Sequence, residues 1–340
     1  MSKIALAGLS FIFGFLILGS VVFVVGPQEI ANALFRFSIW GIIPLILLTV
    51  AINILSTVKW QRILAVMGYR VAFFPMLKIW LAGYAISYLT PVVYIGGEFL
   101  RGYILKEKHG VPWKEGLASM AVDRISEAII FISTIFLGAL VLLSHPGAES
   151  LSKIISASII GVMFFGGIVV LMLIFVFQGK SILYALVLKP FGLKKSKGTN
   201  FLYATEKIFI DFFAARNRRH LIWVLNVSVL KYILLWLRNL LILYYLVGFL
   251  SASGSTIALG FSSLAYITPI PAALGAQEAI LAAVFSGVGY ALGTGTALTF
   301  ILRFAEMLMV GAGVYYLIKL GVGMMLLRAV NFVKSLKSEV

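Results

Sequence analysis

Long uninterrupted apolar runs constrain this chain more than any other feature of its sequence. They lie near residues 4–25, 37–57, 117–143, 153–177, 221–249 and 293–318. Each is long enough to cross the hydrocarbon core of a bilayer, which takes about 20 helical residues. The bilayer core offers no water to the backbone, so such runs cross as helices that satisfy their own backbone groups. The sequence therefore predicts an all-α polytopic membrane protein with six full spans in a single transmembrane domain over residues 1–340.

The composition agrees with this class of protein. Hydrophobic residues make up 61% of the chain and charged residues only 12%, which is more apolar surface than a water-soluble protein can bury. The first run follows Met1-Ser2-Lys3 and is longer than the apolar part of a usual signal peptide, so we expect a retained helix. The chain has no cysteine, which excludes disulfides and thiolate metal sites.

A set of polar and helix-breaking residues occurs twice along the chain. The first set is Trp60-x-Arg62, Tyr88-Leu89-Thr90-Pro91, Glu98 and Arg124-x-x-Glu127, and the second is Trp236-x-Arg238, Tyr266-Ile267-Thr268-Pro269, Glu278 and Arg303-x-x-Glu306. The Trp-x-Arg, Thr-Pro and Arg-x-x-Glu motifs lie 176, 178 and 179 residues from their copies. Internal repeats of this kind are typical of transporters. We therefore expect repeat half A over about residues 1–145 and half B over about residues 146–340.

The net charge of +16 carries information about topology. With the amino terminus inside, most of the 28 Lys and Arg residues fall in cytoplasmic segments, as the positive-inside rule requires. The prediction is a multi-pass protein of the cell (inner) membrane with both termini cytoplasmic. A basic charge placed in this way indicates no nucleic-acid partner.

Two apolar segments are expected to enter and leave the membrane on the same side. Segments 58–72 and 101–116 are both basic, hence both cytoplasmic, so the stretch 73–100 between them is predicted to form a re-entrant hairpin. By the same logic the stretch 256–290 enters from outside and returns. Each half then has three crossings and one hairpin, and this odd number of crossings makes the repeat an inverted one.

The two hairpins are expected to break at their Thr-Pro steps, which we assign as hinges: Thr90 and Pro91 in the first, Thr268 and Pro269 in the second. Proline removes a backbone donor, so a break in the bilayer persists only beside protein or a watery cavity. A simple helix kink is the alternative. Two opposed hairpin tips that meet near the midplane would form one central site.

Charged residues within apolar segments are costly and need partners. The candidate substrate-binding residues are Arg124, Arg303, Glu98, Arg101, Glu278, Glu127, Glu306, Asp123 and Lys231. Two interpretations stay open for them. Arg124 with Glu127, and Arg303 with Glu306, are three residues apart on one helix face and could be structural ion pairs. Alternatively, the arginines hold an anionic headgroup, because their planar fork suits phosphate.

Two further cations lie on one helix face, because Lys231 and Arg238 are seven residues apart. We expect Lys231 to add to the central site and Arg238 to extend toward a membrane interface. The basic insert 178–220 interleaves apolar residues with its charges, which predicts amphipathic helices on an anionic membrane surface. A solvated basic loop is the alternative there. Residues 326–338 are expected to form a similar short surface helix.

Several motifs together resemble a known family. They are Lys59-Trp60-Gln61-Arg62, Leu81-Ala82-Gly83, Thr90-Pro91 followed by Gly97-Glu98-x-x-Arg101, Val122-Asp123-Arg124, and Leu274-Gly275-Ala276-Gln277-Glu278. The chain resembles the lysylphosphatidylglycerol synthase transmembrane region, or flippase-like, family over essentially its whole length. Members carry a Pro-Gly-Gly-Leu-Gly run where this chain has Pro271-Ala272-Ala273-Leu274-Gly275. The resemblance implies lipid translocation, as in the flippase domain of the multiple peptide resistance factor, without the lysyl transfer of the synthase domain.

The expected function is a flippase-like or scramblase-like transporter that moves an anionic phospholipid or a polyprenyl-phosphate-linked lipid between leaflets by alternating access. Two alternatives stay open. One is an intramembrane lipid-modifying enzyme that uses the carboxylates Glu98, Glu127, Glu278 and Glu306, and the other is an ion-coupled transporter of a soluble anion. We assign no catalytic residue, cofactor or metal. Membrane lipids are the expected partners, and homo-oligomer formation is left open.

Overall fold

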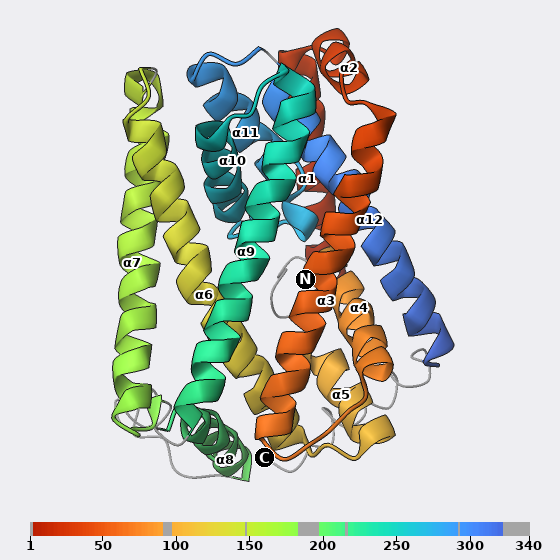
Figure 1. Ribbon diagram of the computed structural model, residues 1–340, viewed down its shortest axis with the longest axis vertical. Helices are drawn as coiled ribbons and strands as arrows, with labels where there is room; N and C mark the ends of the chain where they lie inside the picture. The colour runs from red at the N-terminus through yellow and green to blue at the C-terminus, as the bar shows by residue number, and fades with distance from the viewer. Residues whose placement is uncertain are drawn as a thin grey trace.

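The protein is entirely helical in the part that the computed structural model describes, which comprises residues 3–90, 97–146, 148–182, 197–214, 217–291 and 293–321 (Figure 1). Five described helices are long and apolar enough to cross a membrane: α3 (Ile39–Val66), α6 (Trp113–Leu143), α7 (Ser152–Phe177), α9 (Arg218–Val247) and α12 (Thr294–Lys319). They coincide with five of the six predicted runs. The chain is therefore a multi-pass helical membrane protein.

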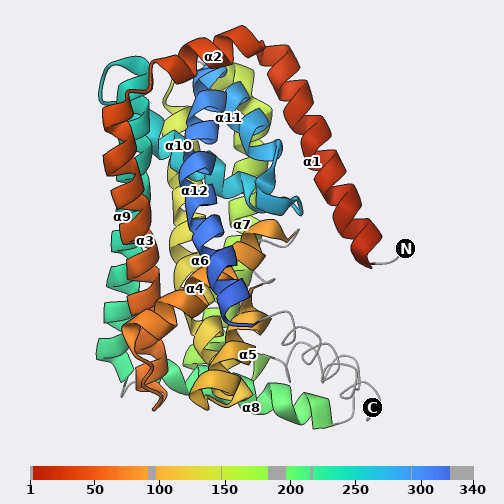
Figure 2. The same ribbon diagram turned by 90° about the vertical axis from the view of Figure 1, so that its right-hand side faces the viewer.

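The remaining predicted run corresponds to α1 (Lys3–Val25), which continues into α2 (Pro27–Phe35) after a bend of 84°. Gly26 adopts a positive φ of 93° between the two helices, and Pro27 occupies the first turn of α2, where its missing N–H costs nothing. Counted as one broken span, the pair brings the number of described spans to six. Figure 2 shows α1 leaning away from the other helices, with α2 lying across one end of the molecule.

Two pairs of shorter helices occupy opposite halves of the molecule (Figure 1). The first pair, α4 (Phe73–Leu89) and α5 (Glu98–His109), lies in the lower half of the view, and the second, α10 (Ala252–Ala265) and α11 (Ala276–Gly287), lies in the upper half. The short 3₁₀ helix η4 (Pro271–Ala273) lies in the connection between α10 and α11, and η1 (Ala148–Leu151) precedes α7. Helix α4 lies within the predicted hairpin segment 73–100, but α5 begins only at its end and continues to His109, through part of the segment 101–116 that was expected to be a cytoplasmic loop. Helices α10 and α11 cover most of the segment 256–290, and α10 begins four residues before it. Pro91, the first predicted hinge proline, lies outside the described residues.

The helices of the two halves pack against one another in a crossed pattern. Helix α3 packs along α9, α4 along α12, and α10 along α6. Small residues permit the close approach that such membrane contacts need. A Cβ on Gly260 of α10 would lie 2.6 Å from the carbonyl oxygen of Thr134 and 2.9 Å from the Cα of Gly138, both in α6. A Cβ on Gly313 of α12 would collide with the carbonyl oxygen of Leu81 in α4.

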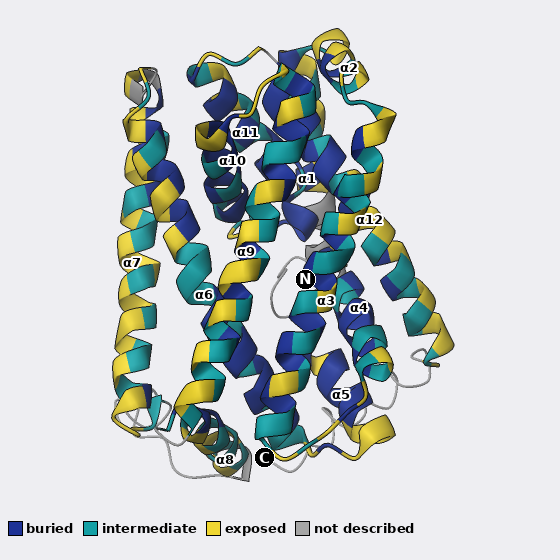
Figure 3. Ribbon diagram, in the orientation of Figure 1, coloured by how far each residue is buried: buried dark blue, intermediate teal, exposed yellow. Residues whose placement is uncertain are grey.

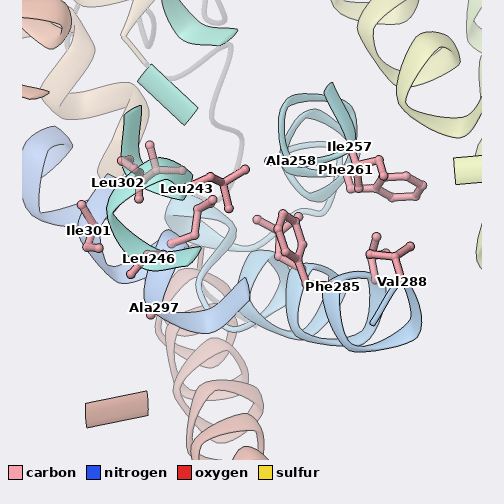
Figure 4. Close-up of a cluster of buried hydrophobic side chains, with 14 of the residues drawn as sticks. Leu243, Leu246, Ile257, Ala258, Phe261, Phe285, Val288, Ala297, Ile301 and Leu302 are labelled. Atoms are coloured by element: carbon pink, nitrogen blue, oxygen red, sulfur yellow. The ribbon is translucent and has the colours of Figure 1, made fainter. Parts of the chain in front are cut away.

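Two apolar cores lie toward the two ends of the molecule. One joins the end of α9 to α10, α11 and the start of α12, and Figure 4 shows its side chains Leu243, Leu246, Ile257, Ala258, Phe261, Phe285, Val288, Ala297, Ile301 and Leu302. The other joins the end of α3 to α4 and α5 around Trp60, Met76 and Ile104. Figure 3 shows buried residues facing inward on most helices, whereas α7 is largely exposed. Only 6% of the most apolar stretch of α7 is buried, against 50% of the corresponding stretch of α12.

Helix α8 (Lys197–Phe212) lies crosswise to the long helices at the lower end of the molecule (Figure 2). Its residues Phe209 and Phe212 pack with Val176 of α7 and Val224 of α9 in a third apolar cluster. Leu202 on the same helix is 51% exposed. The helix lies within the predicted amphipathic insert 178–220. Residues 183–196 of that insert and the predicted surface helix 326–338 lie outside the described residues, and contact with a membrane surface stays a prediction.

Candidate functional site: a charged central cavity

A cavity of about 180 Å³ with several charged lining residues lies between the two halves. Its lining residues come mainly from helices α3, α4, α5, α6, α9, α10 and α12, and α11 adds Gln277. The charged lining residues are Arg101, Arg124, Lys231, Arg238, Glu127 and Glu306. Four cations thus face two carboxylates, so the lining favours an anionic ligand. Tyr88 and Tyr266, which occupy matching positions in the two sequence motif sets, also line the cavity.

Arg124 connects the cavity to the first short helix pair. Its Nε and Nη2 donate to Oε1 of Glu98 at 2.9 and 2.6 Å, whereas its Nη1 is 3.7 Å from Oε2 of Glu127. The expected partner on the same helix is therefore present but distant. The close partner is supplied by α5, and the ion pair fastens α5 to α6. Of the predicted residues, Arg124 and Glu127 line the cavity, and Glu98 lies directly behind the lining.

Arg303 makes the corresponding contact in the second half. It donates from Nε and Nη2 to the carboxylate of Glu278 on α11, the second of these at 2.9 Å. Its Nη1 and Nη2 also donate to the carbonyl oxygens of Ala272 and Ala273 at 2.9 and 3.2 Å. In addition, Nη1 lies 3.4 Å from the hydroxyl of Tyr88 in the first half. The arginine and Glu278 lie behind the cavity lining.

Glu306 has different partners from the one expected. The predicted pair of Glu306 with Arg303 is wrong, because Oε1 of Glu306 lies 3.3 Å from Nη2 of Arg238 and Oε2 accepts from the hydroxyl of Tyr266 at 3.2 Å. The expectation that Arg238 extends to an interface is also wrong. Its side chain is buried with 6% exposed and lines the cavity. A buried charge requires a partner of opposite charge, and Glu306 of helix α12 is that partner for Arg238 of α9.

Lys59 is a site residue that the sequence placed among the cytoplasmic charges. It is fully buried, and its Nζ lies 2.9 Å from Oδ1 of Asp123 and 2.8 Å from Oε1 of Glu127. The same oxygen of Glu127 accepts from Nζ of Lys231 at 2.6 Å. Asp123 and Glu127 are four residues apart on one face of α6, which was the available signal for a shared cation. The basic residues that follow Lys59 in segment 58–72 instead predict a cytoplasmic position for it.

Arg101 begins the segment 101–116, which is predicted to be cytoplasmic, and it is also a predicted binding residue. The structure places Arg101 in the cavity wall. It is 2% exposed. Its guanidinium carbon lies 4.1 Å from the ring centre of Trp80, and its Nη1 is 3.6 Å from Oε1 of Glu98. Gly83 makes room for it, because a Cβ there would collide with the Arg101 side chain. The Leu-Ala-Gly motif and the Glu-x-x-Arg motif therefore meet at this contact.

Some buried polar atoms around the cavity have no hydrogen-bond partner within the described part of the chain. They include Nε of Arg101, Nε of Arg238, Oδ1 of Asn239 and Oε1 of Gln277, all from lining residues. Buried polar groups in proteins are almost always paired, so a group of unpaired ones beside a cavity favours a polar ligand or water there. Among the described residues, no three His, Asp or Glu side chains are arranged to hold a metal ion.

The family model for the lysylphosphatidylglycerol synthase transmembrane region matches residues 11–313. The chain belongs to this family. It is also similar to a UPF0104 membrane protein of Methanocaldococcus jannaschii, with 24% identity over 38% of this chain and 39% of the relative. Two UPF0104 membrane proteins of Methanothermobacter thermautotrophicus are 30% and 29% identical, over 39% and 44% of this chain and 39% and 43% of the relatives. Each of these matches spans about two fifths of the relative.

This family member carries two alanines at an unusual backbone conformation. Ala272 and Ala273 have positive φ values of 52° and 50°, in the left-handed region that favours glycine. They stand where the resemblance expects two glycines, and it is their carbonyl oxygens that accept from Arg303. The backbone of the second connection is thus shaped to present carbonyls to an arginine. Glycine is not required for that contact.

The predicted hinge residues Thr90 and Thr268 occupy matching positions in this family member. Thr90 follows α4 and donates its hydroxyl to the carbonyl of Ser87 at 3.3 Å, and Thr268 follows α10 and donates to that of Ala265 at 2.7 Å. Each threonine therefore caps the last turn of a short helix. Pro269 comes next, at the start of the break between α10 and α11. Their movement as hinges stays a prediction.

Proposed function

We propose that the protein is a flippase-like or scramblase-like transporter of an anionic phospholipid or a polyprenyl-phosphate-linked lipid. The main support for this proposal is the central cavity, which lies inside a membrane protein and is lined by four cations and two carboxylates. Arg124, Lys231 and Arg238 each already contact a carboxylate. A phosphate in the cavity would form further short charge-assisted hydrogen bonds with the arginines. Membership of a family named for the transmembrane region of a lipid synthase supports a lipid as the cargo.

The packing supports an inverted repeat in which α4–α5 and α10–α11 are re-entrant hairpins from opposite sides. Each hairpin packs on the third long helix of the other half, and α3 packs on α9, which is its counterpart in the repeat. The ion pairs of Glu98 with Arg124 and of Glu278 with Arg303 also correspond. Such reciprocity is expected of two halves related by a two-fold axis in the membrane plane. The basic insert 178–220, which contains α8, would then mark the cytoplasmic end.

In this mechanism Arg124 binds the phosphate, because it faces the cavity and its side chain is 25% exposed. Glu98 orients the guanidinium and is displaced in part when the phosphate binds. Arg303 of α12 links the two hairpins. It contacts Tyr88 of the first hairpin and donates to two backbone carbonyls in the connection between α10 and α11 of the second. The hairpins open alternately at Thr90–Pro91 and Thr268–Pro269, and each opening breaks contacts on one side of the cavity.

Replacement of Arg124 by Gln tests this function. We expect translocation of phosphatidylglycerol or a polyprenyl phosphate in vesicles to slow about tenfold or more, because a hydrogen bond to a charged group contributes about 1.5–3 kcal/mol. Lys153→Gln, an exposed charge at the start of α7, is the matched control. Mass spectrometry of copurified lipids should detect an anionic class that is enriched in the wild type and lost in Arg124→Gln.

An unchanged rate in Arg124→Gln would refute the role of Arg124. If the lipids copurified with both proteins match the bulk membrane, the cargo is not an anionic lipid, and a soluble anion becomes the leading alternative.

A further inference from the structure

A second cavity of about 300 Å³ lies between α6 and α7 and reaches α9 and the end of α10. Its lining is almost entirely apolar and includes Phe131, Ile132, Gly161, Val162, Phe165 and Leu264. We propose that this cavity, called the chain cavity below, holds one hydrocarbon chain of the anionic lipid whose headgroup occupies the central cavity. The inference rests on the proposed function and adds a second binding site to it.

The two cavities adjoin each other. Arg124, Glu127, Phe131 and Tyr232 line both of them. A lipid phosphate held by Arg124 would therefore lie at the mouth of the chain cavity. Ser158 is the remaining polar residue of the chain-cavity lining beyond this junction, and its hydroxyl donates to the carbonyl of Ile154 at 2.7 Å. A ligand there meets almost only hydrocarbon, which is the environment of an acyl or isoprenoid chain.

Helix α7 forms a loose outer wall for this cavity. It packs mainly on α6 and η1, and Figure 1 shows it standing beside α6 at the edge of the molecule. A Cβ added to Gly161 or to Gly167 would meet nothing within 4 Å, and one on Gly166 would reach only Ile132 of α6 at 3.6 Å. Small residues thus leave space along the wall where a chain can enter from the bilayer side.

Hydrophobicity alone does not select the occupant. Lipid tails are as apolar as the cavity wall, so a chain gains no hydrophobic free energy by moving from the bilayer into the protein. Bulk lipids would fill such a space without preference for one headgroup. Selective occupancy requires an attachment at the other end of the molecule, and Arg124 at the junction provides one for a phosphate. The proposal therefore predicts that occupancy of the chain cavity depends on the headgroup.

Photo-crosslinking in vesicles of phosphatidylcholine tests this dependence. The probes are phosphatidylglycerol, a polyprenyl phosphate and phosphatidylcholine, each with a diazirine in one hydrocarbon chain and each at the same low fraction. We expect at least one anionic probe to label Ile132 and Val162 in preference to the phosphatidylcholine probe. Phe164 and Val170, which are 63% and 56% exposed on the outer face of α7, should be labelled equally by all three.

Two variants of α7 form a matched pair for the same experiment. Gly161 lines the chain cavity and Gly167 does not, yet both have open space for a larger side chain. Gly161→Phe is expected to abolish the selective labelling of Ile132 and to slow translocation, and Gly167→Phe is expected to change neither. Gel filtration and the unfolding temperature of both variants establish that they fold. The wild-type labelling pattern tests the proposal independently of either variant.

The outcomes separate this inference from the proposed function. Equal labelling of Ile132 and Val162 by all three probes overturns the chain cavity as a selective site, even if translocation depends on Arg124. Selective labelling without any translocation supports the chain cavity and overturns the transport function.

Discussion

Single residues of the central site depend on one another because they are buried charges. Lys59 has no exposed surface, and its ammonium contacts the carboxylates of Asp123 and Glu127. The carboxylate of Glu127 also contacts Lys231. Removing one member of such a group leaves an uncompensated charge in a low-dielectric interior, whereas removing a matched pair does not. The second half has leucines, Leu235 and Leu302, where the repeat offset places the counterparts of Lys59 and Asp123. An apolar pair is thus already accommodated at the corresponding place.

Lys59→Leu is therefore expected to lower the free energy of unfolding by about 3 kcal/mol, because Asp123 loses its close cation. The double variant Lys59→Leu, Asp123→Leu should recover most of that loss. Thermal unfolding in detergent, followed by circular dichroism, measures both effects. If the single variant is as stable as the wild type, Lys59 is not the partner on which Asp123 depends.

Replacing either of the two left-handed alanines, Ala272 and Ala273, is expected to stabilise the protein. Ala272→Gly and Ala273→Gly are each expected to raise the free energy of unfolding by up to about 1 kcal/mol, because an L-residue in the left-handed region is strained by about 1–2 kcal/mol and glycine is not. Ala258→Gly in the middle of α10 is the control, and should cost about 1 kcal/mol. The same thermal measurement checks all three. A loss of stability in the Ala272 and Ala273 variants would mean that their strain is compensated elsewhere.

At the scale of helices, the two halves approach each other closely where α10 packs on α6. It depends on Gly260 and Gly138, which lie almost backbone to backbone. Polar contacts from Thr134 to Ser263 accompany it at 3.4 Å. The same arrangement, with Gly313 against Leu81, recurs between α12 and α4. Each short helix pair is thus held by the other half of the protein.

Gly260→Val is expected to lower the free energy of unfolding by about 2 kcal/mol, because overpacking a close contact costs about 1–3 kcal/mol. Gly311→Val on α12 is the control, since a Cβ there meets nothing within 4 Å. The midpoint of thermal unfolding in detergent measures the difference. Equal midpoints for the two variants would show that α10 and α6 can separate without cost.

At the scale of the whole molecule, an apolar core lies toward each end and the charged cavity lies between them. Arg124 and Arg303, with their carboxylates, come from corresponding positions of the two repeats, yet only Arg124 lines the cavity. Each half supplies two cations and one carboxylate to the lining, namely Arg101, Arg124 and Glu127 from half A and Lys231, Arg238 and Glu306 from half B. The charges of the two halves are therefore equal in number but lie at different places in the repeat. If the halves alternate in opening, this difference makes the two open states unequal in their affinity for an anion.

The sequence predicted the long helices well because their formation is a local matter. A run of about 20 apolar residues in a bilayer has to satisfy its backbone within itself, and only a helix does so. The long helices α3, α6, α7, α9 and α12 follow the predicted runs for this reason. The polar candidates were also identifiable from sequence, since a charge within such a run needs a partner wherever the chain goes.

What the tertiary structure alone decided is the identity of each partner. Spacing along one helix favoured Arg303 with Glu306, yet Glu278 of another helix holds Arg303, and Glu306 is left to Arg238. The sequence favours other places for Lys59 and Arg238, because a long basic side chain can also extend its charge to the membrane interface. Ion pairs depend on distances between helices, and the packing of the helices sets those distances. The sequence alone determined which charges need partners, and the packing of the two halves decided which residues supply them.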